Sequence, residues 1–146
     1  MKITIIGSGN VAWHLGKALQ QAGHDIVAVY SPTAIHREAL AKELAPAKAV
    51  ASPDLRTTGA ELFVIAVPDA ALASVAAVVQ VPEGAMIVHT SGSQPLAALQ
   101  GIASARTGVL YPLQTFSKSK SVDFNTVPIL VEAEDEQTLQ TLRKVS

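Results

Sequence analysis

The chain opens with a short apolar run, breaks at two glycines and continues with apolar residues at helical spacing. Residues 2–6 read Lys-Ile-Thr-Ile-Ile, which is typical of a buried parallel strand. Gly23 marks the end of the helical pattern, because glycine is common just after a helix. The predicted buried face of this helix consists of Val11, Leu15, Ala18, Leu19 and Ala22.

Strand and helix patterns continue to alternate along the rest of the chain. The expected strands cover residues 25–31, 47–51, 62–67, 85–90, 107–113 and 127–131. The expected helices cover residues 33–44, 70–79 and 134–146, and one further helix carries Leu96, Ala98 and Leu99. The strand at 62–67 is apolar throughout, as a parallel strand covered on both faces should be. We therefore predict an α/β fold with a doubly wound, mainly parallel sheet and helices on both faces.

One stretch, residues 62–81, is apolar enough to suggest a membrane span. Pro68 and Asp69 divide it into a strand-sized piece and a helix-sized piece, and a charge beside a proline would be costly at the centre of a span. We interpret the stretch as a β-α unit and expect no membrane partner.

The turn after the first strand carries the main candidate chemistry. Its residues match the G-x-G-x-x-G/A pattern of dinucleotide-binding turns, and they are Gly7, Ser8, Gly9, Asn10, Val11 and Ala12. The glycines allow a sharp turn and the close approach of a ligand, and Ala12 allows close packing of helix and strand. Free N–H groups at the helix start favour an anionic group such as a pyrophosphate. The pattern predicts a dinucleotide site, with a purely structural turn as the alternative.

The end of the second strand bears on the choice of cofactor. An NAD site would place Asp or Glu there, whereas Ser31, Pro32 and Thr33 stand at this end and Arg37 lies on the next helix. Hydroxyl groups beside a cation suit a 2′-phosphate, so we expect NADP (NADPH). Asp25 opens the strand, roughly 15 Å or more from the ligand end at ~3.3 Å per residue. In the alternative interpretation, Arg37 is only a solvated helix residue.

Two later strand ends are expected to line the nicotinamide side of the cofactor. Val67 and Pro68 stand at the end of one of these strands, and Ser91 and Gly92 follow the other, where small polar residues suit a pocket floor. Asp69 is placed to contact the cofactor ribose or to cap the helix that follows, and we expect the cap.

His89, Ser91 and Tyr111 are the candidate catalytic residues, and the pattern leaves His89 and Tyr111 with a structural alternative. His89 lies at the predicted ligand edge, but a satisfied core imidazole fits its position equally well. Ser93, next to Ser91, would cap the following helix if it has no role in the site. Tyr111 stands beside a proline that fixes the backbone, and its ring either faces a substrate or fills the rim of the sheet.

Composition narrows the class of protein. The 146 residues suit one domain with its own core. With a formal net charge of -1 and 16% charged residues, the chain lacks the positive charge that binds nucleic acid, so we expect no nucleic-acid partner. The absence of cysteine removes disulfides, metal thiolates and thiol nucleophiles, and no histidine spacing suggests a metal site. The N-terminus lacks the pattern of a signal peptide, so we expect a cytoplasmic protein.

Two features suggest a further contact surface. The last helical pattern continues to the end of the chain without a stop signal. Trp13 projects nearly opposite the predicted buried face of the first helix, so we expect it to be exposed and available to another domain or subunit.

Five segments of the chain together resemble a family of bacterial proteins with an N-terminal Rossmann-like, NADP-binding domain and a helical C-terminal domain. They read Gly-Ser-Gly-Asn-Val-Ala-Trp-His-Leu at 7–15, Val-Tyr-Ser at 29–31, Ile-Ala-Val-Pro-Asp at 65–69, His-Thr-Ser-Gly-Ser at 89–93 and Tyr-Pro-Leu-Gln-Thr-Phe-Ser at 111–117. This family is similar to pyrroline-5-carboxylate reductase and, more distantly, to prephenate dehydrogenase and β-hydroxyacid dehydrogenases.

The resemblance implies an NADP-dependent oxidoreductase that acts on a small-molecule substrate, with residues 1–146 as its cofactor domain. In the relatives, the helical domain closes over the nicotinamide, forms the homodimer and supplies much of the substrate site, and we expect it to be absent from this chain. Prephenate dehydrogenases place a catalytic His where this chain has Tyr111, so that role does not transfer. The alternative function is a non-catalytic NADP-binding sensor or interaction module.

Overall fold

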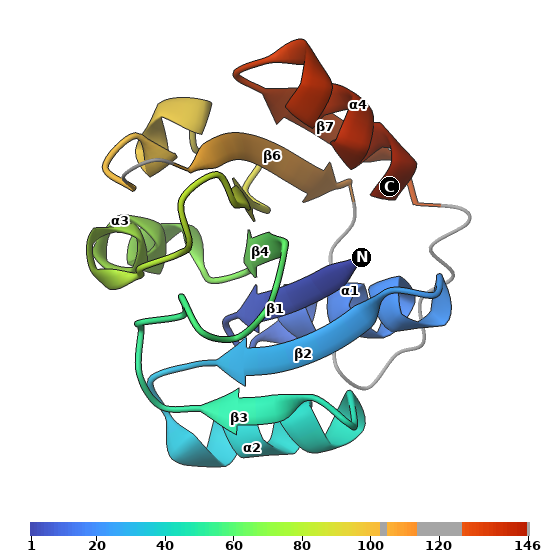
Figure 1. Ribbon diagram of the computed structural model, residues 1–146, viewed down its shortest axis with the longest axis vertical. Helices are drawn as coiled ribbons and strands as arrows, with labels where there is room; N and C mark the ends of the chain where they lie inside the picture. The colour runs from blue at the N-terminus through green and yellow to red at the C-terminus, as the bar shows by residue number, and fades with distance from the viewer. Residues whose placement is uncertain (103–104, 114–126, 146) are drawn as a thin grey trace.

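The computed structural model describes residues 1–102, 105–113 and 127–145 of the chain (Figure 1). Its strands are β1 (Lys2–Ile6), β2 (Asp25–Tyr30), β3 (Lys48–Val50), β4 (Leu62–Ile65), β5 (Met86–His89), β6 (Arg106–Pro112) and β7 (Ile129–Ala133). Its helices are α1 (Asn10–Gln21), α2 (Ala34–Glu43), α3 (Asp69–Val78), α4 (Glu136–Val145) and the 3-10 helix η1 (Leu96–Leu99). Each lies close to its predicted position, although β7 begins two residues later than expected. Residues 114–117 of the last family segment lie outside the described residues.

The described strands form one sheet in the order β3-β2-β1-β4-β5-β6-β7. Neighbouring strands are parallel throughout, except that β7 runs antiparallel to β6. The chain adds strands first on one side of β1 and then on the other, which makes the sheet doubly wound. The predicted fold class is confirmed.

Helices cover the sheet on both faces and enclose two apolar cores. Helices α1, α2 and α4 pack on one face, and α3 and η1 pack on the other. In β4, Leu62 and Val64 enter the first core, whereas Phe63 and Ile65 enter the second. This two-sided burial explains why the strand is apolar at every position.

Helix α1 buries a face that is rotated from the predicted one. Its buried apolar residues include Ala12, Leu15 and Leu19, whereas Ala22 is exposed. The cause is close packing at Gly16, where an added Cβ would lie 2.8 Å from Cδ1 of Leu44. The buried face therefore includes Gly16, and this face lies closer to Trp13 around the helix than the predicted face does.

The prediction of an exposed Trp13 is therefore wrong. The side chain is partly buried and packs against the first core. Single residues on a helix change face when the helix rotates by a fraction of a turn, and spacing alone does not determine that rotation.

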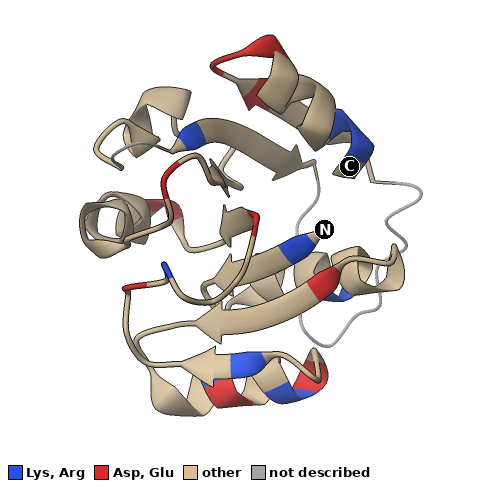
Figure 2. Cartoon of the chain, in the orientation of Figure 1, with Lys and Arg blue, Asp and Glu red and all other residues tan. Residues whose placement is uncertain are grey.

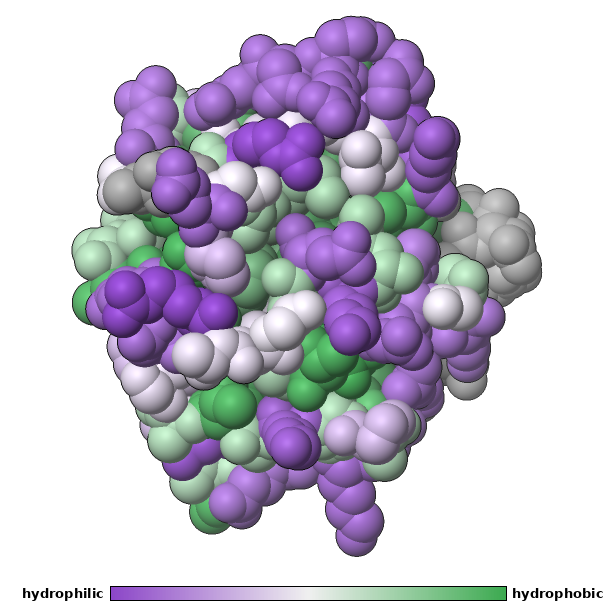
Figure 3. Space-filling view, viewed as in Figure 1, coloured by the Kyte–Doolittle hydropathy of each residue, from purple (hydrophilic) through white to green (hydrophobic). Residues whose placement is uncertain are grey.

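Helix α4 closes the far end of the first core. Leu142 is fully buried, and Gly108 on β6 leaves room for it, since an added Cβ there would lie 2.6 Å from Cδ1 of Leu142. Figure 3 shows hydrophilic residues over the outward side of this helix. In Figure 2, acidic and basic residues alternate on α2, whereas α4 is acidic at its start and basic in its last turn. In the described part of the chain, no helix is both long and apolar enough to cross a membrane.

The substitution Leu142→Ala is expected to lower the free energy of unfolding by about 2–5 kcal/mol, because it leaves a cavity between α4 and the sheet. Leu130→Ala is the matched control, since Leu130 is 54% exposed, and it should change the free energy by less than about 0.5 kcal/mol. Chemical denaturation of both variants measures the difference. Equal losses would show that α4 does not depend on this contact.

Candidate functional site

The strand register brings the candidate residues to one edge of the sheet. Ile6 at the end of β1 pairs with Tyr30 of β2 and with Ile65 of β4, and Ile65 pairs in turn with His89 of β5. The next residue of each strand therefore stands at the same level of the sheet. The predicted site residues that follow these strand ends are Gly7, Ser8, Gly9, Asn10, Val11, Ala12, Ser31, Thr33, Arg37, Val67, Pro68, Ser91 and Gly92.

Gly7 is required by the fold itself. Its φ is +116°, and an added Cβ would lie 2.2 Å from the carbonyl oxygen of Ala66. Its N–H donates a hydrogen bond of 2.7 Å to the carbonyl of Tyr30. Any side chain at this position would separate the end of β1 from the end of β4.

Gly9 has no such internal reason to be glycine. Its φ is −81°, a value open to all residues, and an added Cβ would meet no described atom within 4 Å. It is exposed and stands at the N-cap of α1. The open space in front of Gly9 is where the sequence pattern expects a ligand to approach the backbone.

The N-terminus of α1 carries no side-chain cap from the part of the chain that the structure describes. Its first turn also holds no acidic residue. The first amides of a helix have no intrahelical acceptors and carry the positive end of the helix dipole. This end of α1 is therefore suited to an anion.

A polar cluster joins the glycine turn to the end of β2. The hydroxyls of Ser8 and Ser31 are 2.9 Å apart and hydrogen bonded. Arg37 Nη1 donates to the carbonyl oxygens of Ser31, at 3.0 Å, and of Pro32, at 3.3 Å. Thr33 is exposed at the N-cap of α2. The fold thus brings Arg37 to the strand end, rather than leaving it as a free surface side chain.

The segment after β4 lies directly against the glycine turn. Val67 is half-buried, and its Cγ1 is 3.0 Å from the position that a Cβ on Gly7 would occupy. Pro68 is exposed. Both predicted residues therefore lie next to the turn.

The loop after β5 is shaped by its own hydrogen bonds. Ser91 Oγ accepts from the backbone N–H groups of Ser93, at 3.2 Å, and Gln94, at 3.1 Å. Gly92 lies under the ring of Tyr111, whose Cε2 is 2.4 Å from the position of an added Cβ. Gly92 is thus needed for packing, and Tyr111 belongs to the wall of this loop.

His89 has the geometry of a structural imidazole. It is fully buried, and its Nδ1 accepts a hydrogen bond of 3.1 Å from the backbone N–H of Ser91. Nε2 lies 3.0 Å from the carbonyl oxygen of Pro95, to which it donates if Nδ1 is the acceptor. With both ring nitrogens engaged, the structure favours the core alternative over an acid-base role for His89.

Asp69 does not cap α3, so this expectation is wrong. The helix begins at Asp69, and its N-cap is Pro68, without a side-chain capping bond. The carboxylate instead accepts a hydrogen bond from the hydroxyl of Ser93, across the gap between two strand ends. Ser93 likewise does not cap η1, whose N-cap is Pro95.

The contact between Asp69 and Ser93 was missed in the sequence, although a signal existed. Each residue stands four positions after the last residue of its strand, and β4 and β5 are neighbours in the sheet. Hydrogen bonds from Ser93 and then Ser91 lower the pKa of Asp69, so the carboxylate is ionised at neutral pH.

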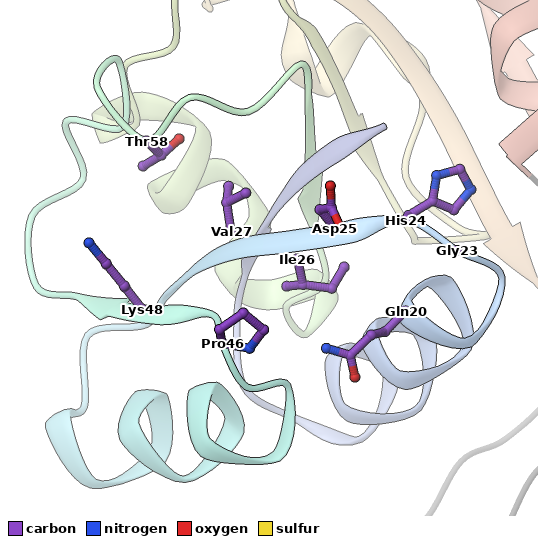
Figure 4. Close-up of a pocket in the computed structure, with 9 residues that line it drawn as sticks. All are labelled: Gln20, Gly23, His24, Asp25, Ile26, Val27, Pro46, Lys48 and Thr58. Atoms are coloured by element: carbon purple, nitrogen blue, oxygen red, sulfur yellow. The ribbon is translucent and has the colours of Figure 1, made fainter.

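A separate hollow of about 650 Å³ lies on the side of the sheet where the parallel strands begin, opposite the candidate site (Figure 4). It is lined by Gln20, Gly23, His24, Asp25, Ile26, Val27, Pro46, Lys48 and Thr58, near the first residues of β2 and β3. Burial, followed by the charge of the N-terminal amino group, lowers the pKa of His24. This hollow is not part of the candidate site.

The profile of the Rossmann-like domain family matches residues 1–115. None of the curated proteins compared with the chain matches it. A proposed NADP oxidoreductase from Bacteroides fragilis is 34% identical, with a TM-score of 0.83 over 99% of this chain and 56% of its own.

More distant structures share the fold. A pyrroline-5-carboxylate reductase from Streptococcus pyogenes is 19% identical, with a TM-score of 0.77 over 99% of this chain and 54% of its own. A prephenate dehydrogenase from A. aeolicus, in complex with hydroxyphenyl propionate and NAD+, is 15% identical. Its TM-score is 0.79 over 99% of this chain and 56% of its own. The chain therefore spans a little over half the length of these structures.

The two glycines of the turn are expected to respond differently to alanine. Gly7→Ala should lower the free energy of unfolding by roughly 2–4 kcal/mol, because of its positive φ and the nearby carbonyl. Gly9→Ala should lower it by less than about 1 kcal/mol, because the added methyl group meets open space. Urea denaturation compares them directly. A large loss in Gly9→Ala would contradict the ligand-related explanation of that residue.

Proposed function

The chain belongs to the Rossmann-like domain family, and from this premise we propose that it binds NADP as the cofactor domain of an oxidoreductase. The observation that carries the proposal is the N-terminus of α1, which within the described residues has no side-chain cap and no acid in its first turn, and which lies behind an open Gly9. Its amides would hold the pyrophosphate, together with the backbone of residues 7–12.

NADP is favoured over NAD by the groups at the end of β2. Arg37 is held there by two carbonyls, and the described contacts engage only its Nη1, which leaves other guanidinium donors for a 2′-phosphate. Ser31 and Thr33 add hydroxyls, and no carboxylate follows the strand. The 34% identical protein from Bacteroides fragilis is itself described as a proposed NADP oxidoreductase, which supports the same choice.

The nicotinamide half would lie along the ends of β4 and β5. Val67 and Pro68 would form one wall, and Ser91 and Gly92 the other. The bound cofactor supplies the hydride, whereas these residues hold and orient the ring. The substrate would be a small molecule, and residues beyond this chain would complete its site, since the matched structures are nearly twice as long.

A non-catalytic NADP sensor or interaction module is the second candidate. It is favoured by His89, whose two ring nitrogens are engaged within the described structure. Substrate-dependent oxidation of NADPH by a longer form of the protein would support the enzyme, and binding without turnover would support the sensor.

Titration calorimetry with NADPH and NADH tests the cofactor. NADPH should bind more tightly, and Arg37→Ala should reduce this preference by roughly tenfold, because it removes a charge-assisted contact to the 2′-phosphate. Lys42→Ala, which removes a positive charge from the other end of α2, is the control and should preserve the preference. Equal affinities in the wild-type chain, or binding of neither cofactor, would count against the proposal.

Gly9→Ala should weaken NADPH and NADH alike, by about tenfold, because its methyl group would occupy the approach to the α1 amides. The same calorimetric experiment measures both affinities. Unchanged affinity for both would mean that the pyrophosphate lies elsewhere.

A further inference from the structure

The two loops assigned to the nicotinamide half are joined to each other at two levels. At the base, Thr90 Oγ1 donates a hydrogen bond of 3.4 Å to the carbonyl oxygen of Ile65. At the rim, Asp69 accepts a hydrogen bond from Ser93. We call the Asp69–Ser93 pair the rim clasp. It connects residues that are 24 positions apart in the chain.

The loop on the β5 side of the clasp is internally braced. Its backbone is tied to His89 through the N–H of Ser91, and the other nitrogen of that ring contacts Pro95. Ser91 Oγ holds the N–H of Ser93 and lies 3.3 Å from its hydroxyl. These bonds all lie within the loop, so they set its internal shape but not its position relative to β4. Other contacts must determine that position.

Asp69 supplies the one charged group of this network within the described residues. Its position at the first residue of α3 places the carboxylate at the positive end of a helix dipole. Hydrogen bonds from Ser93 and Ser91 lower its pKa, which keeps the acceptor ionised at neutral pH. Hydrogen bonds to an ionised acceptor are stronger than neutral ones, although exposure reduces the gain.

We propose that Asp69 is a positioning residue for the nicotinamide half of the cofactor. Through Ser93, it holds the turn of Ser91 and Gly92 at a set distance from Val67 and Pro68. It acts through the loop and not by contact with the cofactor. This inference rests on the proposed function and deepens it. It assigns the spacing between the two sides of the nicotinamide site, after β4 and after β5, to one side-chain pair.

The test compares NADPH with 2′,5′-ADP, which carries the adenosine and the 2′-phosphate but no nicotinamide. Asp69→Asn and Ser93→Ala should each weaken NADPH by roughly 3–10-fold and leave 2′,5′-ADP within about twofold of the wild-type chain. The double variant should be no weaker than either single variant, because both changes break the same bond.

Asp54→Asn is the matched control. Its side-chain hydrogen bond with Arg56 lowers the pKa of Asp54 to about 2, so the substitution removes an equally ionised carboxylate. The backbone of Asp54 forms a β-bridge with Gln80, which follows the C-terminal end of α3. The rim clasp lies at the other end of this helix. This variant should bind both ligands as the wild-type chain does.

Three outcomes would overturn the inference: unchanged NADPH affinity in both clasp variants, equal weakening of NADPH and 2′,5′-ADP, or additive losses in the double variant. Ser93→Ala keeps the test valid if Asp69→Asn is poorly folded, as judged by thermal unfolding. If the wild-type chain binds neither ligand, the proposed function fails instead, so the two failures are distinguishable.

Discussion

The close approach of Gly7 to the carbonyl of Ala66 is the constraint on which the candidate site depends. With a side chain at position 7, the backbones of β1 and β4 could not meet at their carboxyl ends, since an added Cβ would lie 2.2 Å from that oxygen. This is the place where the strand order changes direction, because β2 and β4 flank β1 on opposite sides. Open α/β sheets bind ligands in the crevice formed at such a point.

The same edge holds three kinds of group, which come from the ends of β1, β2, and β4 with β5. The start of α1 offers amides, the end of β2 offers hydroxyls and a guanidinium, and the ends of β4 and β5 offer a clasped pair of loops. The groups are ordered along the sheet as the parts of a dinucleotide would be, with the pyrophosphate at the centre. The proposed function follows from this order as much as from the glycine motif.

Local sequence patterns were sufficient to predict the structure where one residue type has a specific backbone or packing role. The glycine turn, the apolar run at 62–67 and the stop at Gly23 each carry such information, and the structure has a strand, turn or helix end at each. They were insufficient for Trp13 and Asp69. The first depends on how α1 is rotated against Leu44, and the second on a partner 24 residues away. Neither is encoded in the spacing of neighbouring residues.

The sequence by itself determined the alternation of strands and helices, the parallel character of the buried strands and the position of the glycine turn, because these depend on local conformational preference and on the period of apolar residues. Only the tertiary structure decided that the two nitrogens of His89 are engaged, that Arg37 lies over the end of β2, and that Asp69 binds Ser93. The contact of Asp69 with Ser93 depends on the register between β4 and β5, which is a property of the assembled sheet. The contacts of His89 and Arg37 depend on how the chain folds back after β5 and after β2, which the spacing of apolar residues does not specify.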